Sequence, residues 1–172
     1  MLNLPQLVDV YEESIYRQAR EDHPDLSTQE GFFQSRDDLY NYLQYVFFTD
    51  QNAKYFLWEM NKQYVCALRV ESYLDGLLVQ AVETHPQHRR KGYAKQLLCA
   101  AKAQLFKDGF ACLYSHVEKT NGASLALHLC CGFTILKENA RLADGSVSNR
   151  YYTLQYNKMD SALGNTTQGS NA

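Results

Sequence analysis

Apolar side chains in the first 50 residues recur at helical spacing, which predicts two amphipathic helices. Pro5 suits the first position of a helix, because proline lacks an N–H that a helix start leaves unpaired. Apolar side chains then follow at every fourth position, at Leu7, Tyr11 and Ile15. Residues 23–31 are rich in loop formers, and Ser35 followed by Asp38 resembles a capping box. The pattern therefore predicts a connection through residue 31 and a second helix that begins near Ser35.

After residue 54 the pattern changes to short runs of β-branched and aromatic residues, which predict strands. The expected strands cover residues 55–60, 64–70, 77–84, 110–117, 133–137 and 151–156. Two further helices are expected between them, one ending near Gly109 and the other covering residues 121–131. In the second of these helices three side chains are expected to face inward, namely Leu125, Ala126 and Leu129.

The composition is that of one packed domain. The 172 residues are 45% hydrophobic and 13% aromatic, with a formal net charge of -2, and a chain of this size buries a core without disulfides or metals. We expect a single domain over residues 1–159 and a polar, mobile tail over residues 160–172. No secretory signal or membrane-spanning run is present, so a cytoplasmic protein without a membrane partner is expected. The near-neutral charge argues against nucleic acid as a partner.

The five cysteines form no CxxC pair and lie mostly in apolar runs. They are Cys66, Cys99, Cys112, Cys130 and Cys131. This distribution predicts reduced, buried thiols. Cys130 and Cys131 are adjacent, but no second Cys/His pair stands at ligand spacing, so we expect neither a metal site nor a redox role.

The segment from residue 82 to 94 carries the most informative chemistry. It joins a predicted strand to a predicted helix through a basic turn. The first N–H groups of a helix have no intrahelical partner and lie at the positive end of its dipole, so an anion is favoured there. Small residues at Gly92 and Ala94 let a pyrophosphate approach the main chain, and residues 89–91 add positive charge. The alternative is a solvated basic turn, because the spacing is that of neither a Walker loop nor GxGxxG.

The run Arg89-x-x-Gly92-x-Ala94 resembles the R/Q-x-x-G-x-G/A signature of the GNAT superfamily, whose members are acetyl-CoA-dependent N-acetyltransferases. As in that family, a strand and a proline precede the run and a helix with a Leu-Leu pair follows it. The resemblance implies a mixed, mostly antiparallel central sheet of the α/β (α+β) class, flanked by helices and splayed at the acetyl-CoA site.

A second run resembles the family's second motif. Asn121 is followed by a predicted helix and by Cys131-Gly132-Phe133, in the order that the family shows. Together the two motifs place residues 55–156 within the resemblance.

The resemblance implies an acetyl-CoA site built mainly from backbone. The N–H groups that would hold the pyrophosphate belong to Arg89, Arg90, Lys91, Gly92, Tyr93 and Ala94. The backbone of Val82 and Thr84 would follow the pantetheine arm, and Asn121 would hold the pantetheine or the start of the next helix. The alternative for Asn121 is a plain helix cap.

The sequence departs from the family in two places. Only four residues precede Pro5, so the family's first edge strand is expected to be short or absent. The position where the family often has a tyrosine that protonates the CoA thiolate holds His128, whose ordinary pKa near neutrality suits a proton donor. The alternatives are a histidine hydrogen-bonded at the helix surface, with Tyr93 or Tyr114 as the acid.

Glu83 is the candidate general base, because it is the only carboxylate on the predicted central strand. Apolar neighbours would raise the pKa of this carboxyl, which could then accept the amine proton directly or through a water. The alternative is that Glu83 pairs with a basic residue or only orients the substrate. Cys130 suggests an acyl-enzyme, but a core thiol is the simpler interpretation.

The acceptor that we expect is the primary amine of a small molecule. Acidic residues of the N-terminal part favour a cationic amine, namely Glu12, Glu13, Glu21 and Asp22. Aromatic residues such as Trp58 and Tyr64 could wall an acceptor pocket, although helical spacing places most of the second helix's aromatics in the core. The alternatives are acetylation of a protein N-terminus or lysine, and a non-catalytic acyl-CoA-binding module. The sequence is compatible with a homodimer.

Overall fold

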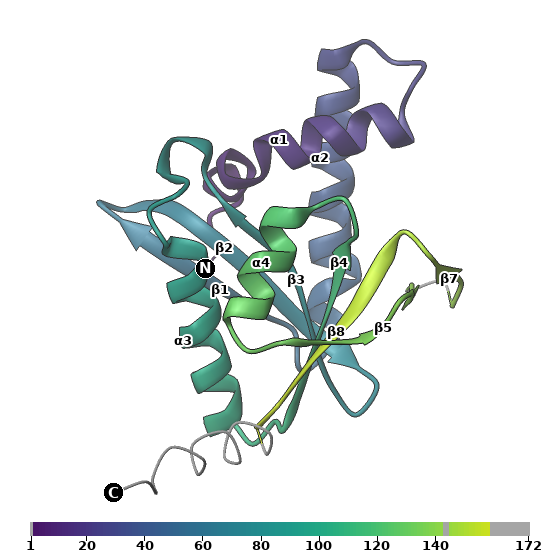
Figure 1. Ribbon diagram of the computed structural model, residues 1–172. Coiled ribbons are helices and arrows are strands. Elements are labelled where there is room, and N and C mark those ends of the chain that lie inside the picture. The colour runs from purple at the N-terminus through teal and green to yellow at the C-terminus, as the bar shows by residue number, and fades with distance from the viewer. Residues whose placement is uncertain (1, 143–144, 159–172) are drawn as a thin grey trace, which may run out of the picture. The chain divides into compact units, whose positions relative to one another are not determined.

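The computed structural model describes residues 2–142 and 145–158. Its helices are α1 (Leu4–Asp22), α2 (Thr28–Tyr45), η1 (Phe47–Thr49), η2 (Pro86–His88), α3 (Tyr93–Lys107) and α4 (Gly122–Cys130) (Figure 1). Its strands are β1 (Lys54–Met60), β2 (Gln63–Tyr73), β3 (Gly76–Thr84), β4 (Cys112–Glu118), β5 (Thr134–Lys137), β6 (Ala140–Arg141), β7 (Val147–Ser148) and β8 (Tyr151–Asn157). The predicted tail, residues 160–172, lies outside the described residues.

Six of the strands form one mixed sheet in the order β1-β2-β3-β4-β8-β5. β3 and β4 run parallel, with Leu77 opposite Leu113 and Val79 opposite Ser115. β8 runs antiparallel to both β4 and β5. The expectation of a mixed, mostly antiparallel sheet flanked by helices is confirmed. β6 and β7 form a separate two-stranded ladder, which the sequence pattern did not predict.

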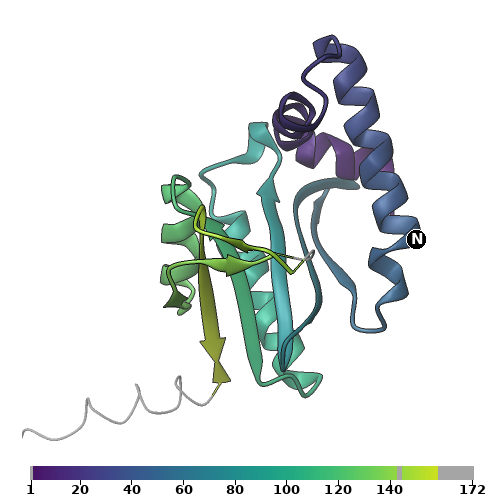
Figure 2. The same cartoon turned by 90° about the vertical axis from the view of Figure 1, so that its right-hand side faces the viewer.

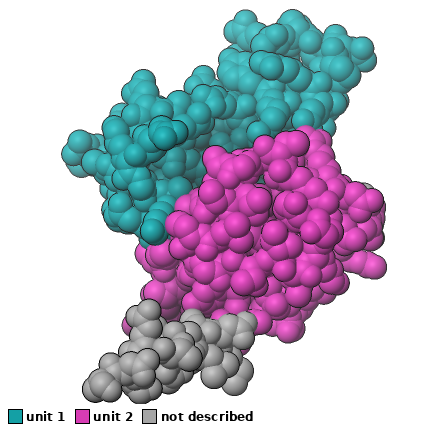
Figure 3. Space-filling view, viewed as in Figure 1, with its two compact units in different colours: residues 1–69, 81–97 teal, residues 70–80, 98–172 magenta. Residues whose placement is uncertain are grey.

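The chain divides into two compact units, drawn in teal and magenta in Figure 3. Unit 1 comprises Met1–Arg69 and Ala81–Leu97, and unit 2 comprises Val70–Gln80 and Leu98–Ala172. Within the described ranges, no helix is both long enough and apolar enough to cross a membrane.

Unit 1 begins with α1, whose start agrees with the sequence pattern. Asn3 is the N-cap, its side chain accepting a hydrogen bond from the Gln6 N–H, and Pro5 lies in the first turn. The inward face is formed by Leu7, Val10, Tyr11, Ile15 and Ala19, all of them buried. In the described part of the chain no strand precedes α1.

The predicted start of α2 at Ser35 is wrong, because the helix begins about two turns earlier, at Thr28. The capping box is formed instead by Ser27, which accepts from the Glu30 N–H, and by Glu30, which accepts from the Ser27 N–H. Ser35 is buried inside the helix. A Cβ on Gly31 would lie 3.4 Å from the Ala19 Cβ, so this glycine allows α1 and α2 to approach closely. A residue that looks like a loop former thus lies at the contact between the two helices.

The core of unit 1 is formed by residues of α1, α2, η1 and β2. Figure 2 shows the backbone of the molecule from the side. The core contains Leu7, Val10, Tyr11, Ile15, Leu43, Phe47 and Ala67. Of the aromatic residues in and after α2, Phe47 is buried, whereas Tyr45 and Phe48 are exposed. The core prediction therefore holds for only part of this group.

In unit 2, α4 packs against β4, and its inward residue differs from the prediction. Leu129 and Ala126 are not buried, whereas His128 is. A helix of nine residues presents only a short face to the sheet, and the histidine can take the inward position because both ring nitrogens find partners there.

The cysteines are all free thiols. Cys66, Cys112 and Cys131 are buried as predicted, but Cys99 and Cys130 are exposed. The interpretation of Cys130 as a core thiol is therefore wrong: it lies one residue before the C-cap of α4, on the outer side of the helix end.

Candidate active site

The basic turn in unit 1 joins β3 to α3 through residues 85–92 and has the backbone geometry of an anion site. Arg90 and Gly92 have positive φ angles of 61° and 83°. The first hydrogen bond of α3 runs from the Gln96 N–H to the Gly92 carbonyl, at 3.0 Å. The N–H groups of Tyr93, Ala94 and Lys95 therefore precede the helical hydrogen bonds and remain available to a ligand. Left-handed residues next to a helix start are typical of main-chain concavities that bind phosphate.

Gly92 is required by conformation more than by space. A Cβ at this position would meet only the Gln96 Nε2, at 3.6 Å, which is an ordinary contact. Its φ of +83°, however, is one that other residues adopt only with strain. The residues of the turn thus fit a pyrophosphate bound by backbone.

Two of the three basic side chains brace the turn. The Arg89 guanidinium lies 2.7 Å from the Glu13 carboxylate on α1 and donates from Nε to the Thr84 carbonyl, at 3.2 Å. The Lys91 ammonium donates to the Gln87 carbonyl, at 3.3 Å. Positive charge near the turn is therefore partly neutralised by Glu13, and the anion site depends chiefly on the main chain.

β3 approaches this turn with a local distortion at Ala81. Ala81 has a φ of 48°, in the left-handed region that alanine rarely adopts. Its carbonyl accepts a hydrogen bond from the Tyr11 hydroxyl on α1, at 2.9 Å. Burial raises the pKa of Tyr11 well above its ordinary value, so the phenol stays protonated and keeps donating. A strained residue inside a strand is typical of functional sites.

Beyond Ala81, the side chains of β3 point to opposite faces of the strand. The Thr84 hydroxyl donates to the Cys66 sulfur, at 3.3 Å, whereas Glu83 points to α1. The His85 N–H donates to the Val65 carbonyl, at 2.8 Å, which holds the end of β3 against β2. The candidate pantetheine residues Val82 and Thr84 thus lie directly before the anion-binding turn.

Glu83 is half-buried and hydrogen-bonded to a neutral partner. The Ser14 hydroxyl on α1 donates to its carboxylate and itself accepts from the Arg17 guanidinium, at 3.2 Å. Burial raises the pKa of Glu83 above its ordinary value, although the Ser14 hydrogen bond and the charges of Arg17 and Arg89 oppose this rise. Among the described residues, Glu83 is linked to the basic residue Arg17 through the Ser14 hydroxyl, and its role as base or as substrate-orienting residue stays a prediction. A carboxyl with a raised pKa is suited to accept a proton near neutrality.

His128 lies in unit 2, where both of its ring nitrogens are engaged. Nδ1 lies 2.8 Å from the Ser124 carbonyl, which fixes the ring proton on Nδ1, and Nε2 lies 3.0 Å from the Ser115 hydroxyl. The ring also packs edge-on against Phe133, with centroids 5.3 Å apart. Burial lowers the pKa of His128, so the imidazole is neutral at pH 7. Its interpretation as a surface histidine is wrong, and its role as thiolate acid stays a prediction.

The remaining candidates have clear local roles. The Asn121 side chain caps α4 by accepting from the Ser124 N–H, at 3.0 Å. Tyr93 is the first residue of α3, and the centroid of its ring lies 6.0 Å from that of the Trp58 ring. Tyr114 donates to the Asp75 carboxylate, at 2.6 Å, and burial raises its pKa. The cap is therefore observed, whereas a contact from Asn121 to pantetheine stays a prediction.

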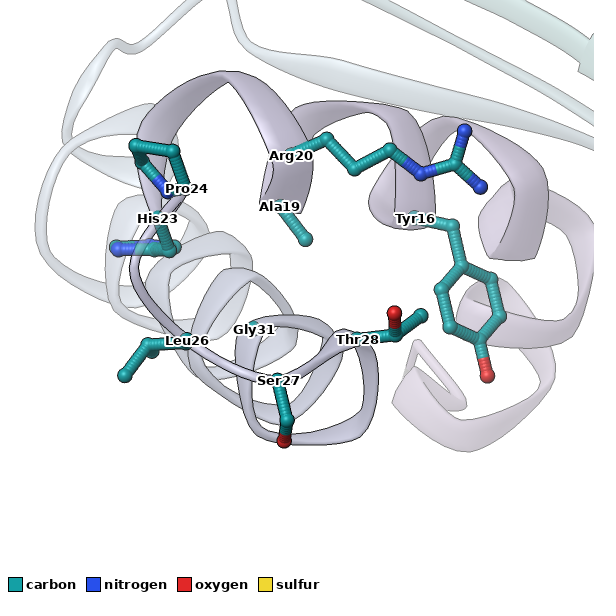
Figure 4. A pocket seen from close by; sticks show the side chains of 9 residues that line it. All are labelled: Tyr16, Ala19, Arg20, His23, Pro24, Leu26, Ser27, Thr28 and Gly31. Carbon is teal, nitrogen blue, oxygen red and sulfur yellow. The ribbon is translucent and has the colours of Figure 1, made fainter.

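A cavity of about 250 Å³ lies in unit 1 where α1 turns into α2 (Figure 4). It is lined by Tyr16, Ala19, Arg20, His23, Pro24, Leu26, Ser27, Thr28 and Gly31. None of the candidate site residues lines it. Among the described residues, no cluster of three or more side chains of the metal-ligating types is present.

A model of the acetyltransferase (GNAT) family matches residues 12–133, which include the turn, Glu83 and His128. The chain belongs to the GNAT acetyltransferase family. It is therefore an acyltransferase that uses acetyl-CoA. The match covers about half of α1, so the family likeness extends further toward the N-terminus than the two sequence motifs indicated.

Solved structures agree with this fold. The GNAT-family chain matches a protein from Pyrococcus horikoshii with a TM-score of 0.64 and 15% identity, over 92% of this chain and 94% of that one. It matches PaiA N-acetyltransferase from Thermoplasma acidophilum, in complex with coenzyme A, with a TM-score of 0.60 and 11% identity over 90% and 92%. An N-acetyltransferase from Staphylococcus aureus matches with a TM-score of 0.58 and 16% identity over 90% and 92%. No curated protein matches the sequence.

Sequence reasoning missed three residues that support the candidate site. Ser14 holds Glu83, Tyr11 holds the carbonyl of the distorted Ala81, and Ser115 meets the His128 ring. The sequence pattern marks Tyr11 only as an apolar helix position. No signal in the sequence pairs these residues, because each is separated from its partner by 13 residues or more.

Proposed function

We propose that this GNAT-family protein transfers the acetyl group of acetyl-CoA directly to the primary amine of a small molecule. The observation that carries the proposal is the state of Glu83 on β3, the strand that leads into the anion-binding turn. Its carboxylate is half-buried, has a raised pKa and accepts a hydrogen bond from Ser14 on α1. Direct transfer needs a base for the amine, because a protonated amine has no lone pair with which to attack a thioester.

The donor would be held through the turn and β3. Backbone N–H groups of residues 90–94 would bind the pyrophosphate, because the Arg89 N–H already donates to the Pro86 carbonyl. The backbone of Val82 and Thr84 would align the pantetheine arm. The oxyanion that forms at the thioester carbon would be stabilised by an N–H of β3 near Thr84. Glu83 would take the amine proton directly or through one water.

The departing thiolate needs a proton, and His128 remains the proposed donor. Its Nδ1–H is held by the Ser124 carbonyl, so a donor role requires that this hydrogen bond be released or that Nε2 carry a proton. Tyr93, which lies at the first turn of α3, is the second candidate. Replacing His128 by alanine distinguishes the two residues, because kcat falls only if His128 is the donor.

A small acceptor is favoured by the surroundings of Glu83. Its carboxylate lies under α1 and is only partly accessible, which suits a slender amine. Of the acidic residues that suggested a cationic acceptor, Glu13 is engaged with Arg89, whereas Glu12 is exposed on α1. Attraction of a cation would therefore depend on Glu12 more than on Glu13.

The test is release of free CoA thiol from acetyl-CoA with panels of three acceptor classes: polyamines and aminoglycosides, amino acids, and peptides with free N-termini or lysines. We expect steady turnover with a small amine and little with peptides. Faster turnover with peptides than with every small amine would reject the proposed acceptor but not the family. Light scattering of the same sample tests whether the protein is a homodimer.

A further inference from the structure

Two thiols in unit 2 lie in contact. The Cys99 sulfur on α3 is 3.9 Å from the Cys131 sulfur at the C-cap of α4. We propose that Cys99 and Cys131 are an oxidation site, at which a hydroperoxide converts the two thiols into a reversible intramolecular disulfide.

Lys102 holds the backbone of Cys131 in place for this reaction. Its ammonium is buried and donates to the Cys131 carbonyl. The same ammonium lies 3.7 Å from the centroid of the Tyr156 ring and 5.8 Å from that of Phe133. Cys99 and Lys102 are three residues apart on α3 and so lie on the same face of the helix. One face of α3 therefore binds both the main chain and the sulfur of Cys131.

The remaining distance is small compared with the freedom of the two side chains. A disulfide bond is about 2.0 Å long, so the sulfurs must approach by roughly 2 Å from contact. Cys131 is the C-cap residue of α4, and both its N–H and its carbonyl are hydrogen-bonded, so the backbone is held. The approach of the two sulfurs therefore requires rotation of the two cysteine side chains.

The difference in exposure between the two thiols determines which of them reacts first. Cys99 is exposed, whereas Cys131 is buried, and burial raises the pKa of the Cys131 thiol to about 12. The peroxide therefore meets Cys99 first. The Cys99 thiolate attacks the peroxide, the O–O bond breaks, and the products are a sulfenic acid on Cys99 and an alcohol or water.

The second step joins the two residues. The Cys131 sulfur attacks the sulfenic sulfur, the S–O bond breaks, and the hydroxyl leaves as water with the proton from Cys131. Overall, two thiols are oxidised by two electrons and one hydroperoxide is reduced, giving a disulfide, water and an alcohol. A dithiol reductant reverses the change by thiol–disulfide exchange.

Cys130 provides a matched control. It is exposed like Cys99 and adjacent to Cys131, but it lies on the outer side of the helix end. If exposure alone decided oxidation, Cys130 would react as readily as Cys99. If the sulfur contact decides it, only Cys99 and Cys131 will pair.

The experiment treats the purified full-length chain with a small excess of hydrogen peroxide and then determines its mass, free thiols and disulfide-linked peptides under non-reducing conditions. We expect a monomer that is lighter by about 2 Da. The thiol count under denaturing conditions should fall from five to three, because one disulfide consumes two thiols. The linked peptide should contain Cys99 and Cys131, and dithiothreitol should restore all thiols.

The variants keep the test decisive. Cys130→Ser should form the bond as the wild type does, whereas Cys99→Ser and Cys131→Ser should not. Cys131 is buried, so its variant can lose stability, but Cys99→Ser changes an exposed residue and remains informative. A link between Cys99 and Cys130, a disulfide between two chains, or a sulfinic acid on Cys99 without a disulfide would each overturn the proposal.

Discussion

Glu83 illustrates, at the scale of single residues, how solvation decides whether a carboxylate can act as a base. The same side chain at the surface would be ionised and weakly basic at neutral pH. Here burial raises its pKa, and the neutral Ser14 hydroxyl keeps it hydrogen-bonded without adding a full charge. Both conditions come from α1 and not from the strand that carries Glu83.

Replacing Glu83 by Gln should remove the base while keeping its shape. We expect kcat/KM at neutral pH to fall by about 10²-fold or more and the acidic limb of the pH profile to disappear. The sign follows from the role: a base must be deprotonated, so activity in the wild type rises with pH through the raised pKa of Glu83. The control is Glu59→Gln, an exposed carboxylate on β1 to which no role in the site is assigned. A well-folded Glu83 variant with an unchanged profile would exclude Glu83 as the base.

Replacing Ser14 by Ala should shift the profile instead of abolishing activity. The Ser14 hydrogen bond stabilises the ionised carboxylate, so its loss raises the pKa of Glu83 further. The acidic limb of kcat/KM should move to higher pH, whereas the rate on the plateau should change little. Ser14→Thr, which keeps a hydroxyl, should restore the profile. A lower plateau with an unmoved limb would show that Ser14 does not act through Glu83.

At the scale of elements, the junction of β3, the turn and α3 is the proposed binding site for coenzyme A. Gly92→Glu should abolish binding, because it places a side chain and a negative charge at the start of α3. Gly92→Ala introduces only the backbone strain of a φ near +83°, about 1 kcal/mol, and should weaken binding less.

The matched control for this junction lies at the other end of the same helix. Gly109→Glu also places a charged residue at a positive φ, of 98°, with no atom within 4 Å of its Cβ. It should bind coenzyme A normally when measured by calorimetry. Equal affinity in the Gly92 and Gly109 variants would remove the turn from the coenzyme site.

His128, the buried residue of α4, has a packing role in addition to its proposed catalytic role. His128→Ala removes contacts with Phe133 and leaves Ser115 without its ring partner, so we expect a loss of about 2–4 kcal/mol in unfolding free energy. If His128 protonates the thiolate, kcat should also fall by about 10²-fold with little change in the KM for acetyl-CoA. Kinetics must be measured below the thermal midpoint of the variant. A wild-type kcat in folded protein would leave His128 only its packing role.

At the scale of the whole molecule, the buried His128 and the half-buried His116 should make stability sensitive to acid. Burial lowers the pKa of both, so the folded chain holds these rings neutral where the unfolded chain would protonate them. The stabilisation is complete above the ordinary histidine pKa of about 6.5 and is lost as the pH falls from there through the lowered value.

Urea unfolding between about pH 7.5 and pH 5.5 tests this linkage. The wild type should lose more unfolding free energy over this range than His128→Gln, which has no ring to protonate. His116→Gln measures the share of the second histidine. Because Glu83 titrates identically in wild type and in both variants, comparing each variant with the wild type removes its opposite contribution. A parallel loss in wild type and both variants would contradict the assignment.

Elements with strong local signals were predicted well. The proline and the four-residue spacing located α1, and the β-branched runs located the six strands of the main sheet to within about three residues. The turn before α3 was found because glycine and basic residues at a strand–helix junction are typical of a main-chain anion site. These features depend on neighbours in the sequence, and so the sequence alone determined them.

Other features depend on contacts between distant segments. Ser27 caps α2 although Ser35 offered a similar local pattern, because burial against α1 favours a longer helix. His128, and not Leu129, faces inward because Ser115 on β4 satisfies its ring. The raised pKa of Glu83 likewise depends on α1, which supplies Ser14. The contact between Cys99 and Cys131 joins α3 to the C-cap residue of α4. Tertiary structure decided these points, since burial and hydrogen-bond partners are supplied by residues far away along the chain.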